Sequence, residues 1–329
     1  MAFTTSTSTP VFTHGPGIAQ IVVLVDGIAR SGKSIIAPII SSFDRVEILR
    51  VDETLDITSS LYTMGQISRE STVAMLRLKI DINLYNGLIG RDSNLRFGDY
   101  SSVWKNSNLL RSLRRLKSSE GQRVLETVQN DRPIYQQTTH DQLGNIDLFI
   151  QAFGDGFRNI QMIRHPADMI SSWMRRDWGS RVGSDPLAFT LTISHQGQNL
   201  PFYAHGWEDE YISASPAGRV VRAIEQIWDR NQSVYESLDE AHKQQVFFIS
   251  FEDFVQRPDA HIEELADFLG SSTTKRTKGA MKRENCPRTL KSNISQTIKS
   301  VEQQVSSEET AIMHRLTGEY EKLAAANTR

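Results

Sequence analysis

Apolar residues occur in two patterns along this chain, and the two patterns alternate. Short β-branched runs without regular polar alternation predict buried parallel strands, most clearly at 21–25 and 246–250, with further strands at 46–51, 132–136 and 159–163. The segments between them predict helices, which we place at 34–43, 66–90, 109–117, 147–153, 166–176, 219–238 and 261–269, and in the tail from Ser306. Strands that alternate with helices predict an α/β fold with a doubly wound, mostly parallel sheet flanked by helices.

Three features depart from this alternation. Residues 1–18 are interpreted as a flexible leader, and 19–329 as a single domain, because no clean linker or internal repeat divides them. Residues 177–217 are rich in Gly, Ser, Asp, Pro and aromatic residues without clear periodicity, which predicts a helical or irregular insertion. Pro38 lacks the N–H that a helix interior needs, so we expect the first helix to kink or to begin late.

The bulk composition limits the classes of function. The chain has 329 residues, of which 39% are hydrophobic and 23% charged, values typical of a globular protein with a proper core. A net charge of −2 gives no general attraction to nucleic acid, and no apolar run is long enough to span a bilayer. The Ser/Thr-rich start lacks the order of a secretory leader, and the single Cys286 excludes an intramolecular disulfide. We therefore expect a cytoplasmic protein without a nucleic-acid partner.

Residues 27–34 carry the clearest motif. They read Gly-Ile-Ala-Arg-Ser-Gly-Lys-Ser and match G-x-x-x-x-G-K-[ST] at every fixed position. In such a loop the glycines turn backbone N–H groups inward, and the following helix adds positive potential. We predict that this loop binds phosphate through Arg30, Ser31, Gly32, Lys33 and Ser34. The loop alone does not name the reaction, because a kinase that uses Mg-ATP has the same motif.

A second segment narrows the choice of nucleotide. An apolar strand runs into Arg164-His165-Pro166-Ala167-Asp168 and then into a helix that carries Ser172. This resembles a signature of sulfotransferases that use PAPS (3′-phosphoadenosine 5′-phosphosulfate): R-x-P-x-D, with a serine eight residues after the arginine. The resemblance implies a P-loop NTPase-like fold, PAPS as the donor, and contacts of Arg164 and Ser172 with its 3′-phosphate. It also implies that Arg30 steadies the leaving group, while Lys33 stands where that family has threonine.

A third stretch leaves an alternative open. The strand at 246–250 leads into Phe251-Glu252-Asp253, then Pro258 and a helix closing on Phe-Leu-Gly, an order that resembles the same family. In a P-loop kinase, Glu252 or Asp253 would instead hold the magnesium ion. A nucleotide-binding module without turnover is a further alternative. We prefer the sulfotransferase, for which no metal site is expected because fixed cations neutralise the leaving phosphate.

The base that takes the acceptor proton has two candidates. His140 ends Thr138-Thr139-His140, which resembles the K-T-H element of cytosolic sulfotransferases, whose histidine is the base. Glu53 is the rival, because tyrosine-specific sulfotransferases place a glutamate in a comparable stretch. The candidate catalytic residues are therefore His140, Glu53 and Arg30, while His165 is expected to be positional.

Neither the acceptor nor the oligomeric state follows from the sequence. The resemblance implies an acceptor with a hydroxyl, such as a carbohydrate or a small molecule. The basic helix at 109–117 is interpreted as a solvated face, with recruitment of an anionic acceptor as the alternative. The basic loop at 275–288 falls where the family closes over the 3′-phosphate. Aromatic groups of the insertion suit either stacking on an acceptor or core packing: Phe202, Tyr203, His205, Trp207 and Tyr211.

Overall fold

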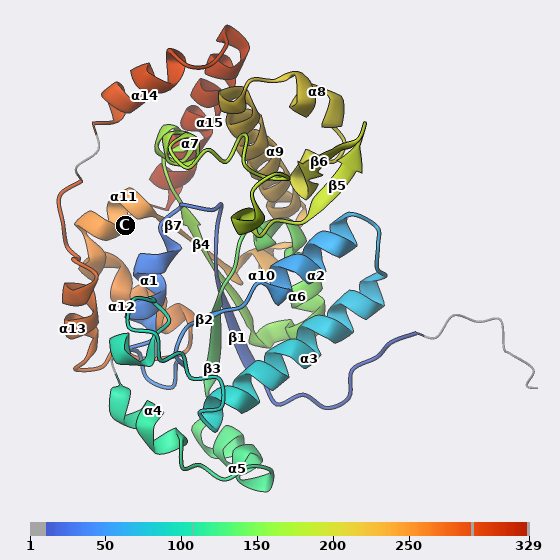
Figure 1. Cartoon of the computed structure of the whole chain (residues 1–329). Coiled ribbons are helices and arrows are strands. Elements are labelled where there is room, and N and C mark those ends of the chain that lie inside the picture. The colour runs from blue at the N-terminus through green and yellow to red at the C-terminus, as the bar shows by residue number, and fades with distance from the viewer. Residues whose placement is uncertain (1–10, 107, 291–292, 328–329) are drawn as a thin grey trace, which may run out of the picture.

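A five-stranded parallel sheet forms the centre of the protein (Figure 1), in a computed structural model that describes residues 11–106, 108–290 and 293–327. The strand order is β2-β3-β1-β4-β7, so the first strand lies in the middle. The strands are β1 (Ile21–Asp26), β2 (Arg50–Val51), β3 (Ile134–Thr138), β4 (Phe157–Ile163) and β7 (Val246–Ser250). The predicted doubly wound α/β fold is confirmed.

The central strand shows why helices must cover both faces of the sheet. Val22 and Leu24 point into one hydrophobic core, whereas Val23 and Val25 point into another, and all four side chains are fully buried. The first core is covered by α2 (Thr54–Thr63), α3 (Arg69–Leu88), α5 (Gln122–Asp131) and α6 (Ile146–Phe153). The second is covered by α1 (Lys33–Ile40), α11 (Phe251–Gln256), α12 (Pro258–Phe268) and α13 (Thr277–Arg283). Because both faces of this strand are buried, its sequence is a continuous apolar run and does not alternate with polar residues.

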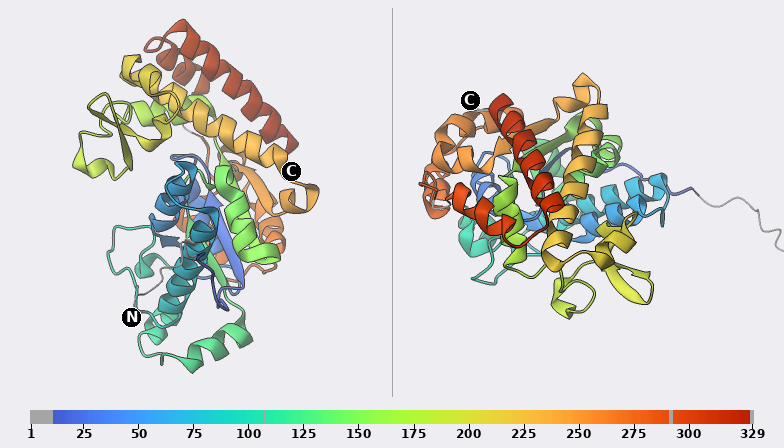
Figure 2. Two further views of the ribbon diagram at one scale, coloured as in Figure 1. Left: turned by 90° about the vertical axis from the view of Figure 1, so that its right-hand side faces the viewer. Right: turned by 90° about the horizontal axis from the view of Figure 1, so that it is seen from above.

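Further helices extend the first core at one end of the sheet. These are α7 (Pro166–Met174), α9 (Pro216–Ser237) and α15 (Ser307–Ala326), and α14 (Ile294–Glu302) contacts α7 and α15. The short α10 (Glu240–Lys243) connects α9 to β7. Figure 2 shows α9 and α15 lying side by side, and the two helices are in contact. Within the described residues, no helix combines the length and apolar character needed to cross a membrane.

The predicted insertion at 177–217 contains regular structure beside α9. An antiparallel hairpin of β5 (Thr192–His195) and β6 (Gln198–Pro201) is followed by α8 (Glu208–Ser213). Figure 1 shows this hairpin standing apart from the central sheet. The insertion packs on the core through Leu200 of the hairpin and through Trp207 and Tyr211 at α8, which are all buried. The hairpin has a regular strand pattern that the composition of the insertion did not indicate.

Several predicted boundaries need correction. The strand expected at 46–51 is reduced to β2 and a single bridge between Val46 and Ile134, and the helices α2, α5 and α14 were not predicted. Part of the expected basic loop at 275–288 is the helix α13. The first helix does not begin late: it begins at Lys33 and contains Pro38 as an interior residue. The tail is helical from Ser307, as predicted.

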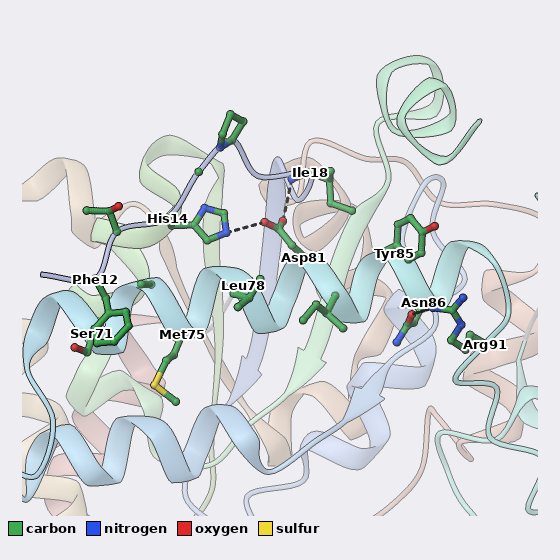
Figure 3. Close-up of a pocket in the computed structure, with 15 residues that line it drawn as sticks. Phe12, His14, Ile18, Ser71, Met75, Leu78, Asp81, Tyr85, Asn86 and Arg91 are labelled. Atoms are coloured by element: carbon green, nitrogen blue, oxygen red, sulfur yellow. Dashed lines mark hydrogen bonds and ion pairs between the residues drawn. The ribbon is translucent and has the colours of Figure 1, made fainter. Parts of the chain in front are cut away.

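The N-terminal segment lies along α3, as Figure 3 shows for residues 12–18. Asp81 of α3 accepts the backbone N–H groups of Ile18 (3.0 Å) and Ala19 (2.8 Å), and its other oxygen lies 3.1 Å from His14 Nε2. The segment and α3 border a cavity of about 790 Å³. Residues 1–10 of the predicted leader lie outside the described part of the chain.

The basic helix at 109–117 packs on the protein through arginines, and most of its leucines face solvent. It forms α4 (Leu109–Arg115), and Leu110, Leu113 and Leu116 are 65%, 40% and 55% exposed. Arg115 instead forms a two-pronged ion pair with Glu47, whose side chain is only 9% exposed. Arg111 donates to the Val46 carbonyl at 2.9 Å. A buried carboxylate is stable only with such partners. The free energy gained by pairing Glu47 therefore exceeds the free energy that burial of three leucines on this short helix would give.

We predict that Arg115→Met destabilises the protein by about 3 kcal/mol, because the buried Glu47 would lose the closer of the two arginines that pair with it. Urea denaturation measures the change. The matched variant Leu110→Gln on the exposed face should change stability by less than about 0.5 kcal/mol. A larger loss from Leu110→Gln than from Arg115→Met would show that α4 packs by its leucines.

Candidate active site

The candidate site lies where β1 and β3 end side by side. β1 continues into α1 on one face of the sheet, whereas β3 continues towards α6 on the other. Loops that leave neighbouring parallel strands in opposite directions open a crevice at their carboxyl ends. Asp26 ties the two loops together: its oxygens accept the Thr139 hydroxyl and the Leu143 backbone N–H, both at 3.0 Å. This crevice contains both the predicted phosphate loop and His140.

Close packing determines the path of the phosphate loop. Gly27 has φ of +142°, and a Cβ there would meet the Met162 carbonyl oxygen at 2.3 Å. Gly32 has φ of +108° and precedes α1 directly, with the Phe251 ring where its Cβ would stand. Trp173 of α7 donates its indole N–H to the Ala29 carbonyl at 2.9 Å. The loop is therefore held from β4, α7 and α11 before any ligand arrives.

Guanidinium groups from three segments gather beside this loop. Arg30 Nε lies 3.4 Å from the Ser172 hydroxyl, and Arg176 also donates to that hydroxyl at 3.0 Å. Arg164 donates to the Arg30 carbonyl at 3.1 Å and lies over the Phe251 ring. The structure thus brings Arg30, Arg164 and Ser172 together, as predicted from separate motifs. Arg176 was missed, although its position one helical turn after Ser172 was a usable signal.

The local electrostatics are those of an anion site. Burial, together with the positive charges of Arg176, Arg164 and Arg175, lowers the pKa of Arg30. Ser31 Oγ and Arg164 Nε are buried and lack a hydrogen-bond partner among the described residues. Buried donors without partners are costly, so a ligand with several anionic oxygens would relieve both the missing bonds and the repulsion. The residues present therefore fit a bound phosphosulfate.

The last two residues of the motif differ from each other in environment. Ser34 is exposed in the first turn of α1. Lys33 is buried, and its ammonium group donates to the Gly27 carbonyl inside the same loop. Burial lowers the pKa of Lys33, and the charges of Asp26 and Asp141 oppose that fall. Lys33 is thus a buried cation of the loop, and nearby carboxylates favour its charged form.

His140 follows β3 and is held by a carboxylate that sequence reasoning missed. Asp56, in the first turn of α2, places Oδ2 3.0 Å from His140 Nδ1 and accepts the His140 backbone N–H on Oδ1 at 3.1 Å. Burial raises the pKa of Asp56, and His140 opposes that rise. Asp56 went unnoticed because the helix that carries it was not predicted.

A cavity of about 520 Å³ connects the two base candidates with the arginine group. His140 and Glu53 both line it, and so does Arg176. Glu53 is exposed just before α2. Aromatic and aliphatic side chains make up much of the remaining wall, and these include Ile57, Trp173, Trp178, Leu187, Phe202 and Tyr203. Of the other predicted aromatic residues, Trp207 and Tyr211 pack against each other, while His205 pairs with Glu208.

The acids of the third sequence stretch are engaged in structural contacts. Glu252 accepts the His165 backbone N–H at 3.1 Å and the Tyr320 hydroxyl at 2.6 Å. Asp253 lies 2.7 Å from His261 Nε2 and also pairs with Arg257. These carboxylates join α11 to the start of α7, to α12 and to α15. His165 itself accepts the Ala167 backbone N–H and so caps α7.

Asp141 is a further acid at the edge of the cavity, in a left-handed backbone conformation with φ of +60°. Its Oδ1 is buried without a hydrogen-bond partner among the described residues. Burial raises the pKa of Asp141 to about 6, a rise that Lys33 opposes and Asp26 reinforces. At neutral pH this carboxylate is therefore charged at a cost to the folded state.

The sign of this shift predicts a pH dependence of stability. Folded Asp141 binds a proton below about pH 6, whereas the unfolded chain does so only near 3.8. The stabilisation from protonation is complete below the unfolded value and is lost as pH rises through the folded one. Relative to Asp141→Asn, the wild type should gain unfolding free energy between pH 7 and about pH 4.5. Urea denaturation at several pH values tests this, and a difference independent of pH would contradict it.

Comparisons with known proteins give the family. The sequence model of the sulfotransferase domain family matches residues 30–322 of this chain. Among solved structures, the sulfotransferase domain from the curacin biosynthetic pathway is 13% identical, with a TM-score of 0.45, over 93% of this chain and 99% of that one. The sulfotransferase domain from the Synechococcus PCC 7002 olefin synthase is 12% identical, with a TM-score of 0.41, over 90% and 97%. The sulfotransferase from Alicyclobacillus acidocaldarius is 15% identical, with a TM-score of 0.38, over 91% and 96%. No curated protein matches the chain.

The family model covers most of the chain, and the chain therefore belongs to the sulfotransferase family, whose fold is P-loop NTPase-like. It is an enzyme of sulfuryl transfer rather than a kinase.

Proposed function

We propose that this enzyme transfers the sulfuryl group of PAPS to a hydroxyl group of a small acceptor. The phosphate loop (Arg30, Ser31, Gly32, Lys33 and Ser34) holds the phosphosulfate, and Arg164 and Ser172 bind the 3′-phosphate. The observation that carries the proposal is a group of donors beside the unpartnered Ser31 hydroxyl: Arg30 and Arg176 both contact the Ser172 hydroxyl, and Arg164 donates to the Arg30 carbonyl. Such a group of donors matches a ligand with phosphate groups at two positions.

The chemistry assigned to the chain is positioning and charge neutralisation. PAPS supplies a sulfuryl group on a good leaving phosphate. Arg30 and Lys33 lie in the loop that faces the leaving oxygen, and their charges offset the negative charge that develops there. Since these charges are fixed in the protein, we propose that transfer needs no metal ion. A held donor and a cavity beside it also give the in-line geometry that the reaction requires.

We assign the role of base to His140 rather than Glu53. The acceptor oxygen forms a bond to sulfur, its proton passes to His140 Nε2, and the bond from sulfur to the bridging phosphate oxygen breaks to release 3′,5′-ADP. His140 is supported because Asp56 fixes one ring nitrogen and both residues line the cavity. Glu53 lies in the same cavity and is exposed like His140, but among the described residues no hydrogen bond orients its carboxylate.

The cavity wall supports a small, partly apolar acceptor over a charged glycan. Leu187, Phe189, Tyr203 and Trp178 line it together with His140. Such apolar side chains suit a compact ligand that buries much of its surface. The basic helix at 109–117 gives less support to an anionic glycan, because Arg115 is occupied by Glu47 and Arg111 by the Val46 carbonyl.

The donor is tested by ligand-induced stabilisation. 3′,5′-ADP should raise the melting temperature with EDTA present, whereas 5′-ADP, which lacks the 3′-phosphate, should raise it much less. The expected gain is about 2.7 kcal/mol at a ligand concentration a hundred times Kd. Arg164→Met and Ser172→Ala should remove the preference for 3′,5′-ADP. Stabilisation by Mg-ATP alone would exclude PAPS as the donor.

The base is tested by comparing two variants in a PAPS turnover assay. His140→Ala should lower kcat by about 10²- to 10⁴-fold, as expected for a lost general base, with unchanged 3′,5′-ADP binding. Glu53→Gln should retain much more activity than His140→Ala. The opposite ranking of the two variants would assign the base to Glu53.

A further inference from the structure

Asp56 divides its two oxygens between two different tasks. Oδ1 accepts the His140 backbone N–H and the Gln142 side-chain amide N–H, both at 3.1 Å. Oδ2 faces the His140 ring, 3.0 Å from Nδ1. The Asp56 side chain is 20% exposed, whereas that of His140 is 46% exposed on the cavity side. The hydrogen bonds at Oδ1 therefore fix the orientation of the carboxylate, and Oδ2 is left to contact the imidazole.

This arrangement selects one form of the neutral histidine. An ionised carboxylate only accepts hydrogen bonds, so the nitrogen that faces it carries the hydrogen. Nδ1 is then protonated, and Nε2 keeps its lone pair free. A base needs such a lone pair directed at the proton that it removes.

We propose that Asp56 is a positioning residue of the reaction: it holds His140 in the Nδ1–H form, with Nε2 free to take the proton of the acceptor hydroxyl. The inference rests on the proposed function, in which His140 is the base, and adds to it a group that does not touch the acceptor. In this proposal α2 contributes to catalysis, because it places Asp56 next to the segment that follows β3.

The alternative is that Asp56 only joins α2 to the segment after β3. The two roles predict opposite results for Asp56→Asn, which preserves size and shape. The His140 and Gln142 donors at Oδ1 would hold the asparagine oxygen in that place, and the amide NH₂ would then face His140 Nδ1. That NH₂ donates to Nδ1 and so forces the hydrogen onto Nε2. If Asp56 only connects α2 to the segment after β3, this change of tautomer leaves kcat unaffected. If His140 is the base, the change removes the lone pair at Nε2 and lowers kcat.

The test ranks variants by kcat in the PAPS assay. Asp56→Asn should lower kcat by about 10³-fold or more, the scale expected when a base is held in the wrong form. Asp56→Ala should cost about 10- to 100-fold, because the ring loses its orientation but keeps access to both forms. The KM for PAPS and the affinity for 3′,5′-ADP should not change in either variant. As a matched control, Asp52→Asn loses the Asp52–Lys79 pair outside the cavity and should lower stability without lowering kcat.

A second measurement does not depend on turnover. Nitrogen NMR of histidine-labelled wild type, with His140 assigned through the missing signal of His140→Gln, should show Nδ1–H where histidine is neutral. Asp56→Asn should show Nε2–H. An active wild type whose Asp56→Asn variant keeps more than half its kcat would overturn this inference alone, as would an Nε2–H form in the wild type. A wild type that transfers no sulfuryl group from PAPS would overturn the proposed function and the inference together.

Discussion

Asp26 is the last residue of the central strand, and its fully buried carboxylate joins the two halves of the site. One oxygen accepts the Thr139 hydroxyl and the other the Leu143 backbone N–H, both in the segment that follows β3. A buried carboxylate is stable only when its oxygens are bonded in this way. The phosphate loop leaves β1 directly after Asp26, and His140 follows Thr139. The placement of the loop relative to His140 therefore depends on this one side chain.

Around this junction the charges are separated by sign. Arg30 of the loop, Arg164 after β4 and Arg176 just beyond α7 lie on one side, and Arg30 and Arg176 both contact Ser172. Asp26, Asp56 and Asp141 lie on the other side, close enough to Lys33 to oppose the fall in its pKa. Such a division suits a transfer in which the leaving group is anionic and the acceptor loses a proton. The positive side offsets the charge of the leaving group, and the acidic side supports an imidazole that becomes positively charged.

The sequence predicted the sheet, the loop and the arginine-serine pair because these features depend on residues that are close in the chain. It did not predict α2, whose Thr- and Ser-rich sequence has little apolar periodicity and weak helix propensity. Packing against α3 stabilises that helix. Nor did it predict that the basic helix packs through its arginines, because their partner Glu47 lies far away in the sequence. In both cases tertiary contacts outweighed the local pattern.

The amino-acid sequence by itself determined the order of strands and helices, the glycines of the phosphate loop, and the positions of Arg164 and Ser172 on one strand-helix connection. These follow from backbone geometry and from periodicity over a few residues. Only the tertiary structure decided that Arg176 joins Arg30 at Ser172, that Lys33 is buried and donates to the Gly27 carbonyl, and that Asp56 holds His140. The reason is physical: Asp56 and His140 are 84 residues apart, and only the packing of α2 beside the end of β3 brings a carboxylate to that imidazole.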